Sequence, residues 1–160
     1  MTTTPYTARP IAPRALKELR TTDDAGRRTD GFTDAEGGSP LRCCLRRGEP
    51  GERLALVSYA PLRRWASETG ATPGAYDEQG PVFIHADACA GPAGDALPFP
   101  GSHRTVRRYS AEGRILGGRL VGDPAGFENA FAQAFADPAV ALVHVRAVEY
   151  GCFLYEVRRP

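Results

Sequence analysis

Short apolar runs separated by stretches rich in glycine and proline dominate the hydrophobic pattern of this 160-residue chain. Runs of strand length fall at residues 54–59, 81–85, 105–110, 114–121, 140–148 and 152–158. Helical spacing is clear only after Asp123-Pro124, where Phe127, Ala130, Phe131, Ala134 and Phe135 recur three or four residues apart. The pattern predicts an α+β fold, with an antiparallel or mixed sheet of five to seven strands and one main helix packed on it.

The intervening segments complete this picture. Residues 1–13 hold little beyond threonine and proline and are predicted to be a flexible lead-in, so residues 14–160 form a single α+β domain. Residues 14–20 suit either a short strand or a turn of helix, and residues 21–40 and 63–80 are predicted loops. Glu112-Gly113 indicates a hairpin turn, and Gly117-Gly118 a bulge or close backbone approach in the returning strand.

Composition and charge exclude some classes of function. Hydrophobic residues make up 42% of the chain and charged residues 24%, with a net charge of +1, which argues against a dedicated binder of nucleic acid or membranes. The chain has no apolar run long enough to span a membrane and no apolar signal core, so a cytoplasmic location with reduced thiols is expected. No phosphate-binding glycine motif has the required strand–loop–helix context, and no organic cofactor is expected.

The stretch Pro-Val-Phe-Ile-His-Ala-Asp-Ala-Cys, residues 81–89, combines a strand with groups able to do chemistry. Because side chains alternate along a strand, Val82 and Ile84 should face one side, and Phe83 and His85 the other. Asp87 and Cys89 follow in the exit loop, where binding residues often gather. His85 is therefore our first candidate for a general acid or base.

A second candidate position is the strand that carries His144 and Arg146, two residues apart and so on one face. A buried charge is costly unless it is paired. Arg146 should therefore meet either a carboxylate such as Glu78 or Asp87, or an anion from a ligand. The sequence leaves open whether the result is a structural pair or a substrate site.

These residues lead to the hypothesis of a small enzyme that acts on an anionic or polar small molecule by acid–base chemistry, as a lyase, isomerase, cyclase or hydrolase. Its candidate catalytic residues are His85, Cys44, His144 and Tyr109, and its candidate substrate-binding residues are Arg146, Arg42, Tyr76, Glu78 and Asp87. The arginines would clamp a carboxylate or phosphate, a tyrosine would donate to an oxyanion, and Cys44 is a conceivable nucleophile. The imidazole, guanidinium and thiol groups would then converge in one enclosed hollow.

Two alternatives stand beside this hypothesis. One is a non-catalytic domain that binds a small molecule or a protein partner. The other is a zinc protein, because the soft ligands of the chain include Cys43, Cys44, His85, Cys89, His144 and Cys152. Their spacing argues against a metal, since no Cys-x-x-Cys occurs and adjacent cysteines seldom bind one ion together, so buried, inert thiols and no metal are the expectation.

Several motifs in order resemble the bacterial family known as domain of unknown function 1203. They are Gly-Gly-x-Pro, an Arg-x-Cys-Leu-Arg segment, Glu-Pro-Gly-Glu, Gly-Pro-x-Phe-Ile-His-Ala with a following cysteine, His-Val-Arg and Gly-Cys-Phe, together covering roughly residues 14–158. The resemblance implies a fold and a polar cluster but no reaction. Where the family typically has Cys-Arg-His-Cys-Leu, this chain has Leu41 for the first cysteine and Cys43 for the histidine, and so would lack one ligand if that cysteine bound a metal.

Overall fold

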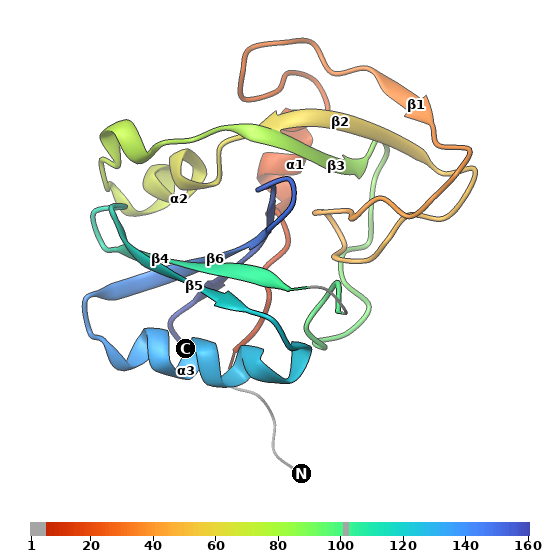
Figure 1. The fold of residues 1–160 in the computed structure, drawn as a ribbon. Helices are drawn as coiled ribbons and strands as arrows, with labels where there is room; N and C mark the ends of the chain where they lie inside the picture. Colours follow the sequence, from red (N-terminus) through yellow and green to blue (C-terminus); the bar gives the residue numbers. More distant parts are fainter. Residues whose placement is uncertain (1–5, 101–102) are drawn as a thin grey trace.

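The computed structural model describes residues 6–100 and 103–160, in which seven strands form two antiparallel sheets. The smaller sheet has the order β1 (Gly31–Thr33), β2 (Arg53–Tyr59), β3 (Gly80–His85), and it lies over the larger sheet in Figure 1. The α+β class and the predicted strand number are confirmed. The strands divide between two layers because the long 86–103 connection carries the chain from one sheet to the other.

The larger sheet has the order β5-β4-β6-β7 and carries the main helix. Its strands are β4 (Arg104–Ser110), β5 (Ile115–Val121), β6 (Val140–Ala147) and β7 (Phe153–Arg158). A single turn, η2 (Pro124–Gly126), leads into α3 (Phe127–Ala136), which covers the face of this sheet that is turned away from the smaller one (Figure 1). The predicted aromatic stripe is buried against the sheet, and the Asp123 side chain accepts from the backbone N–H of Ala125, as expected of a cap.

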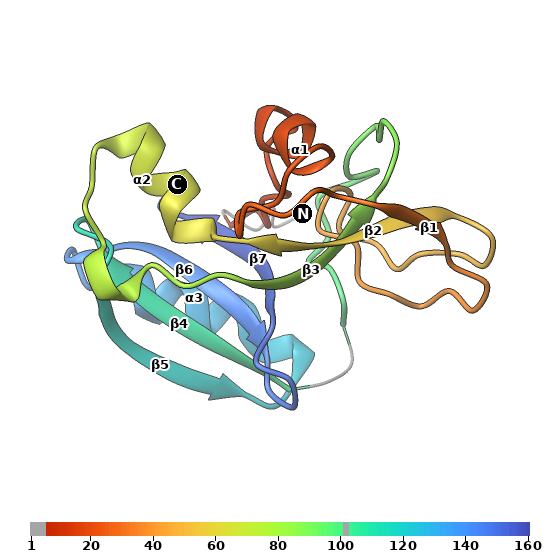
Figure 2. The same cartoon turned by 90° about the horizontal axis from the view of Figure 1, so that it is seen from above.

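Two further helices lie side by side at one edge of the sheets (Figure 2). Helix α1 (Pro13–Leu19) resolves the choice left open for residues 14–20. Helix α2 (Pro61–Thr69), followed by the single turn η1 (Gly74–Tyr76), shows that the loop predicted for residues 63–80 is wrong in its first part. Proline at the first turn and left-handed Gly70 after the last one mark its ends, but only Leu62 and Trp65 give the short helix an apolar face.

The segment before α1 is packed against both sheets. Residues 1–5 of the predicted lead-in lie outside the described residues, but Ala8 and Ile11 are buried. The backbone N–H of Arg9 donates to the carbonyl of Glu156 at 2.8 Å, and that of Ile11 to the carbonyl of Arg42 at 2.9 Å. Buried side chains and backbone bonds thus extend the ordered domain N-terminal to residue 14.

Strand register places the chemistry-bearing side chains. In β3, Val82 and Ile84 are buried while Phe83 and His85 are partly exposed, which confirms the predicted alternation. The Ser110–Arg114 turn joins β4 to β5, whose pairing shifts register opposite Arg108 and Tyr109, so a bulge lies beside Gly117 as predicted. No helix of the described part of the chain is long and apolar enough to cross a membrane.

Candidate metal centre

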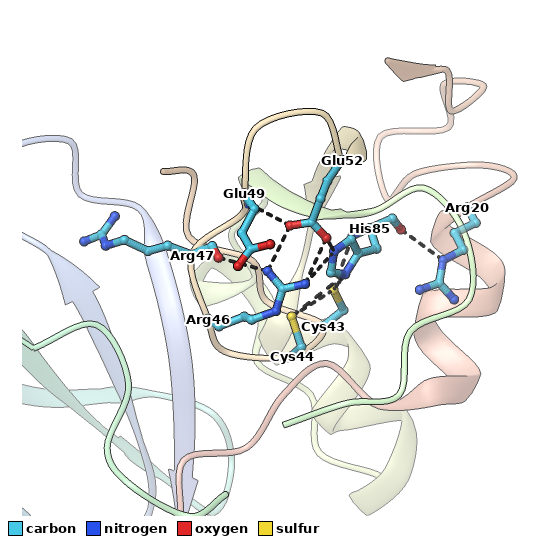
Figure 3. Close-up of polar contacts among 8 residues, drawn as sticks. All are labelled: Arg20, Cys43, Cys44, Arg46, Arg47, Glu49, Glu52 and His85. Carbon is cyan, nitrogen blue, oxygen red and sulfur yellow. Dashed lines mark hydrogen bonds and ion pairs between the residues drawn. The ribbon is translucent and has the colours of Figure 1, made fainter. Parts of the chain in front are cut away.

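Three cysteines and one histidine meet at the end of β3. The Sγ atoms of Cys43, Cys44 and Cys89 and one ring nitrogen of His85 all lie within 4.8 Å of one another. Cys43 Sγ lies 3.3 Å from His85 Nδ1, Cys44 Sγ lies 3.9 Å from the same nitrogen, and the two sulfurs are 3.9 Å apart. Figure 3 shows the imidazole above both thiols. These four residues are the Cys/His cluster.

A tight turn brings neighbouring cysteines to one side. Along a strand, adjacent side chains point in opposite directions, but residues 42–44 form a turn and Leu45 has a left-handed backbone with φ of 58°. The backbone N–H of Leu45 donates to Leu41, and that of Arg42 to Phe83 in β3, so the turn is fixed beside the strand end. The spacing argument against a metal fails here, because the turn allows Cys43 and Cys44 to reach one point.

The cluster does not need the cysteine that the resembled family has in place of Leu41. Leu41 is fully buried with Leu54 in the core around β2 and β3, so this position supplies no ligand atom. Cys43, which stands where the resembled family has histidine, lies within the cluster. Four potential ligand atoms therefore gather without a cysteine at position 41.

A carboxylate orients the histidine. His85 Nε2 lies 2.6 Å from Oε2 of Glu52, which is held by both terminal nitrogens of Arg46 at 2.9 Å and by the backbone N–H of Glu49 at 2.6 Å (Figure 3). These donors, Arg46 first, keep the pKa of Glu52 well below its ordinary value. With Nε2–H donating to a charged carboxylate, the lone pair of Nδ1 faces the sulfurs.

The two adjacent thiols differ in their electrostatics. The Cys43 thiol donates to Cys44, which lowers the pKa of Cys44; the backbone N–H and the charge of Arg46 add to this against the effect of burial. The same hydrogen bond, with burial, raises the pKa of Cys43. The cluster thus favours at least one thiolate, which is the form that binds metals and reacts as a nucleophile.

A cavity of about 220 Å³ opens beside this thiolate. Its wall includes Cys44, Leu45, Arg46 and residues 91–96 of the connection between the sheets. Cys44 is therefore the member of the cluster that lines this small cavity.

Other predicted site residues form a second cluster, on the larger sheet. Glu78 Oε1 accepts from Arg107 at 3.0 Å, and Glu78 Oε2 lies 3.9 Å from Arg146. Arg107 also donates to the Tyr109 hydroxyl at 3.3 Å, and the rings of Tyr109 and His144 lie 4.7 Å apart. The carboxylate that meets Arg146 is thus Glu78, one of the two that the sequence offered.

His144 is fully buried and its partner is a carboxylate of the neighbouring strand. Its Nε2 lies 2.9 Å from Oε1 of Glu156, and the other oxygen of Glu156 accepts from Arg158 at 2.7 Å. Burial lowers the pKa of His144, whereas the hydrogen bonds from His144 and Arg158 outweigh burial and lower the pKa of Glu156. The pair is therefore a neutral imidazole that donates to a carboxylate neutralised by Arg158.

The remaining predicted residues lie apart from both clusters. Arg42 is buried, and its guanidinium donates to the carbonyls of Phe153 and Pro40. Tyr76 is exposed in η1, and Asp87 is exposed with its carboxylate 4.0 Å from Arg53. These contacts bind Arg42 to the backbone, and the ligand-binding roles given to the three residues stay predictions.

The predicted site residues thus meet in two places instead of one hollow. His85 ends β3, while Glu78 lies just before its start at Gly80. Six residues of strand separate such ends by roughly 16 Å at about 3.3 Å per residue. The first place holds Cys44 and His85, at the end of β3. The second holds His144, Arg146, Tyr109 and Glu78, at the larger sheet.

Sequence reasoning missed Glu52 and Arg46. Glu52 follows the Glu-Pro-Gly turn and directly precedes β2, which pairs with β3 so that Leu54 lies opposite His85. A hairpin-like pairing of these two strands would have placed an acidic residue beside the histidine. The acidic residue before the strand is visible in the sequence, but its position beside His85 depends on a strand register that the sequence alone does not determine.

Comparison with known proteins identifies a family. No curated protein and no solved structure matches the chain significantly. A family model described as protein of unknown function (DUF1203) matches residues 38–159, a span that holds the Cys/His cluster and the second cluster. The match covers most of the chain and agrees with the resemblance of its motifs, and the chain therefore belongs to the DUF1203 family.

Proposed function

We propose that the protein binds a zinc ion through Cys43, Cys44, His85 and Cys89. The observation that carries the proposal is the meeting of three sulfurs and one imidazole nitrogen within 4.8 Å. Cysteine and histidine are the ligands that zinc prefers, and a four-ligand set of this kind is typical of structural sites. This is the zinc alternative that the spacing of the residues had disfavoured.

The distances fit a tetrahedral ion. With Zn–S of about 2.3 Å and Zn–N of about 2.0 Å, the edges of a tetrahedron measure about 3.8 Å between sulfurs and about 3.5 Å between sulfur and nitrogen. Cys43 and Cys44 Sγ lie 3.9 Å apart, and their distances to His85 Nδ1 are 3.3 and 3.9 Å. Shifts of a few tenths of an ångström would suffice for these three ligands.

The surroundings of His85 support the same function. Histidines that bind zinc usually donate their other ring N–H to a carboxylate or carbonyl, which fixes the tautomer and makes the ligand more basic. Glu52 stands in that position, 2.6 Å from Nε2, and Arg46 holds it. Arg46 also attracts the thiolate of Cys44, whose pKa it helps to lower.

Zinc would stabilise segments that have little regular structure. The turn that holds Cys43 and Cys44 contains no helix or long strand, and neither do residues 86–100 of the connection that holds Cys89. An ion bound by both would tie them to the end of β3 at His85. A cytoplasmic location belongs to this proposal, since the thiols stay reduced there.

Metal analysis of the purified chain tests the proposal. We expect about one zinc per chain, and a cobalt-substituted form with the charge-transfer absorption of cobalt–thiolate bonds. Cys89→Ser should lose most of the metal, whereas Cys152→Ser, the matched control outside the cluster, should keep it. Equal metal content in Cys89→Ser and the unmodified chain would refute the proposal.

The chain of contacts from Cys44 through His85 to Glu52 favours a second candidate function. Cys44, His85 and Glu52 form a relay of thiol, imidazole and carboxylate, and Cys44 faces the 220 Å³ cavity. This arrangement suits a thiol enzyme in which Cys44 attacks an electrophilic centre of a small polar or anionic molecule, His85 transfers the proton and Glu52 orients it. It keeps the catalytic roles predicted for Cys44 and His85.

The two candidates differ in thiol reactivity. A zinc-bound Cys44 should react slowly with iodoacetamide until a chelator is added, whereas a catalytic thiolate should react rapidly in metal-free protein and lose that reactivity in His85→Gln. Cys152→Ser serves as the control for labelling outside the cluster. Rapid, chelator-independent labelling of Cys44 would favour the enzyme over the zinc site.

A further inference from the structure

A cavity of about 410 Å³ lies where α1, α2 and β7 meet, and none of the Cys/His cluster lines it. Figure 2 shows the two helices on the same side of the molecule, with β7 between them. The lining comes from three segments far apart in sequence, residues 9–18, 59–68 and 153–158. The volume falls within the range of small-molecule sites, which is about 300–1,000 Å³.

The charged side chains of the wall are unequally paired. They are four arginines and three glutamates: Arg9, Arg14, Arg64, Arg158, Glu18, Glu68 and Glu156. Arg158 binds Glu156 at 2.7 Å and Glu68 at 2.8 Å. Arg64 binds Glu18, and also Asp24 at 2.7 Å. Two of the four arginines therefore account for all three glutamates of the wall.

Arg9 and Arg14 are the unpaired cations. Neither guanidinium makes a hydrogen bond or ion pair within residues 6–100 and 103–160, although the charge of Arg14 helps to lower the pKa of Glu18. A guanidinium presents a planar fork of donors that matches the oxygens of a carboxylate or phosphate. Two such groups at one cavity favour an anionic guest.

Tyr59 adds an unused donor. The side chain is only 8% exposed, and its hydroxyl makes no hydrogen bond with any residue that the structure describes. The hydroxyl oxygen itself is not fully buried, so it is accessible to a ligand. Burial raises the pKa of Tyr59, and the charge of Glu156 raises it further, whereas that of Arg64 lowers it. The phenol therefore stays protonated. Because Glu156 and Arg64 both belong to the cavity wall, the hydroxyl can donate into this cavity.

Most of the remaining wall is apolar. Trp65 and Phe153 line the cavity, and the Phe153 ring lies 5.6 Å from that of Tyr59. The side chains of Trp65 and Phe153 are mostly buried, with 6% and 7% of their surfaces exposed, and the exposed part of each is aromatic surface that a planar guest could contact. The cavity therefore combines cations, a neutral donor and an aromatic surface, as small-molecule sites commonly do.

We propose that this cavity binds a small organic anion, a carboxylate or phosphate monoester attached to one flat apolar ring. Arg9 and Arg14 bind the anionic oxygens, Tyr59 donates to a third acceptor, and the ring lies against Trp65. The site is independent of the zinc proposal, because no residue of the Cys/His cluster takes part. Binding would also fasten α1 to α2 and β7.

Tryptophan fluorescence tests the site directly, since Trp65 is the only tryptophan in the chain. The probes are phenyl phosphate and benzoate, with benzyl alcohol as the neutral analogue and benzamidine as the cationic one. We expect a saturable change of Trp65 emission with the two anions, and at least tenfold weaker binding of the other two. No saturable change with either anion, or equal binding of benzamidine, would overturn the proposal.

Two matched double variants locate the binding. Arg9→Gln with Arg14→Gln should weaken phenyl phosphate at least tenfold, whereas Arg27→Gln with Arg28→Gln removes the same charge from exposed positions outside the cavity and should leave it unchanged. Tyr59→Phe should weaken it several-fold with no loss of folding, because only an unbonded hydroxyl is removed. Equal weakening in both double variants would show that net charge alone attracts the probe, and would refute a built site.

Discussion

The imidazole Nε2 of His85 lies 2.6 Å from the carboxylate of Glu52, on the side of the ring opposite the nitrogen that faces the cysteines. This contact joins the first residue before β2 to the last residue of β3, so the pairing of two strands holds the ring in place. The His85 tautomer, and with it the chemistry of the cluster, therefore depends on a carboxylate that is not itself one of the four cluster residues.

Glu52→Gln should weaken zinc binding by about 10- to 100-fold, because an amide accepts more weakly than a carboxylate and His85 becomes a less basic ligand. Competition with a chromogenic chelator measures the affinity. Glu49→Gln is the matched control, since Glu49 contacts Glu52 through its backbone N–H. Equal affinities of Glu52→Gln and the unmodified chain would mean that the carboxylate does not support the ligand.

Removal of the metal should destabilise the fold. At a free zinc concentration 100-fold above the dissociation constant, bound zinc contributes about 2.7 kcal/mol, which corresponds to a fall in Tm of roughly 5–11 °C for a chain of this size. Calorimetry with and without a chelator measures the difference. Cys89→Ser should melt at the same temperature in both conditions, and a chelator effect that persists in this variant would contradict the assignment of the site.

The buried His144 should make stability depend on pH. Its pKa is lowered in the folded protein by burial, so the unfolded chain binds more protons and stability falls as the pH drops below the ordinary histidine value of 6.5. The loss at pH 5.5 is at most about 1.4 kcal/mol. The effect of Glu156, whose pKa is also lowered, appears only at lower pH, near and below the ordinary value of 4.5.

Urea unfolding at pH 7.0 and 5.5 measures this slope. His144→Gln keeps a donor toward Glu156 and should flatten the pH dependence, whereas His103→Gln, which changes a half-exposed histidine, should leave most of it. A slope unchanged in His144→Gln would show that the buried imidazole is not its source.

Local periodicity explains which parts of the fold could be predicted. The alternation of Val82 and Ile84 against Phe83 and His85, and the stripe from Phe127 to Phe135, are repeated signals within one element. Helix α2 buries only Pro61, Leu62 and Trp65, too few for the pattern to distinguish it from a loop. The division into two sheets depends on which strands pair across long connections, and local pattern carries no such information.

The convergence of the four residues of the Cys/His cluster was hard to predict for a related reason. Spacing rules treat Cys43 and Cys44 as if the chain between them were extended, but a turn with left-handed Leu45 allows both sulfurs to reach His85. Cys89 joins them from a loop four residues beyond the strand end. Residue types at these positions could be named from the sequence, whereas their convergence follows from backbone turns that only the structure provides.

The turn between β4 and β5 offers a test of the fold that requires neither of the proposed ligands. Gly113 has φ of 85°, and an added Cβ would lie 2.9 Å from Cβ of Pro73 and 3.4 Å from the Trp65 ring. Gly113→Ala should therefore cost more than the roughly 1–2 kcal/mol of a left-handed backbone alone, because the methyl group also displaces the segment after α2. Gly122→Ala is the matched control, since no described atom lies within 4 Å of its Cβ position, and it should change the free energy of unfolding by less than about 0.5 kcal/mol. Equal stabilities of the two variants in urea unfolding would contradict the packing of this turn against Pro73 and Trp65.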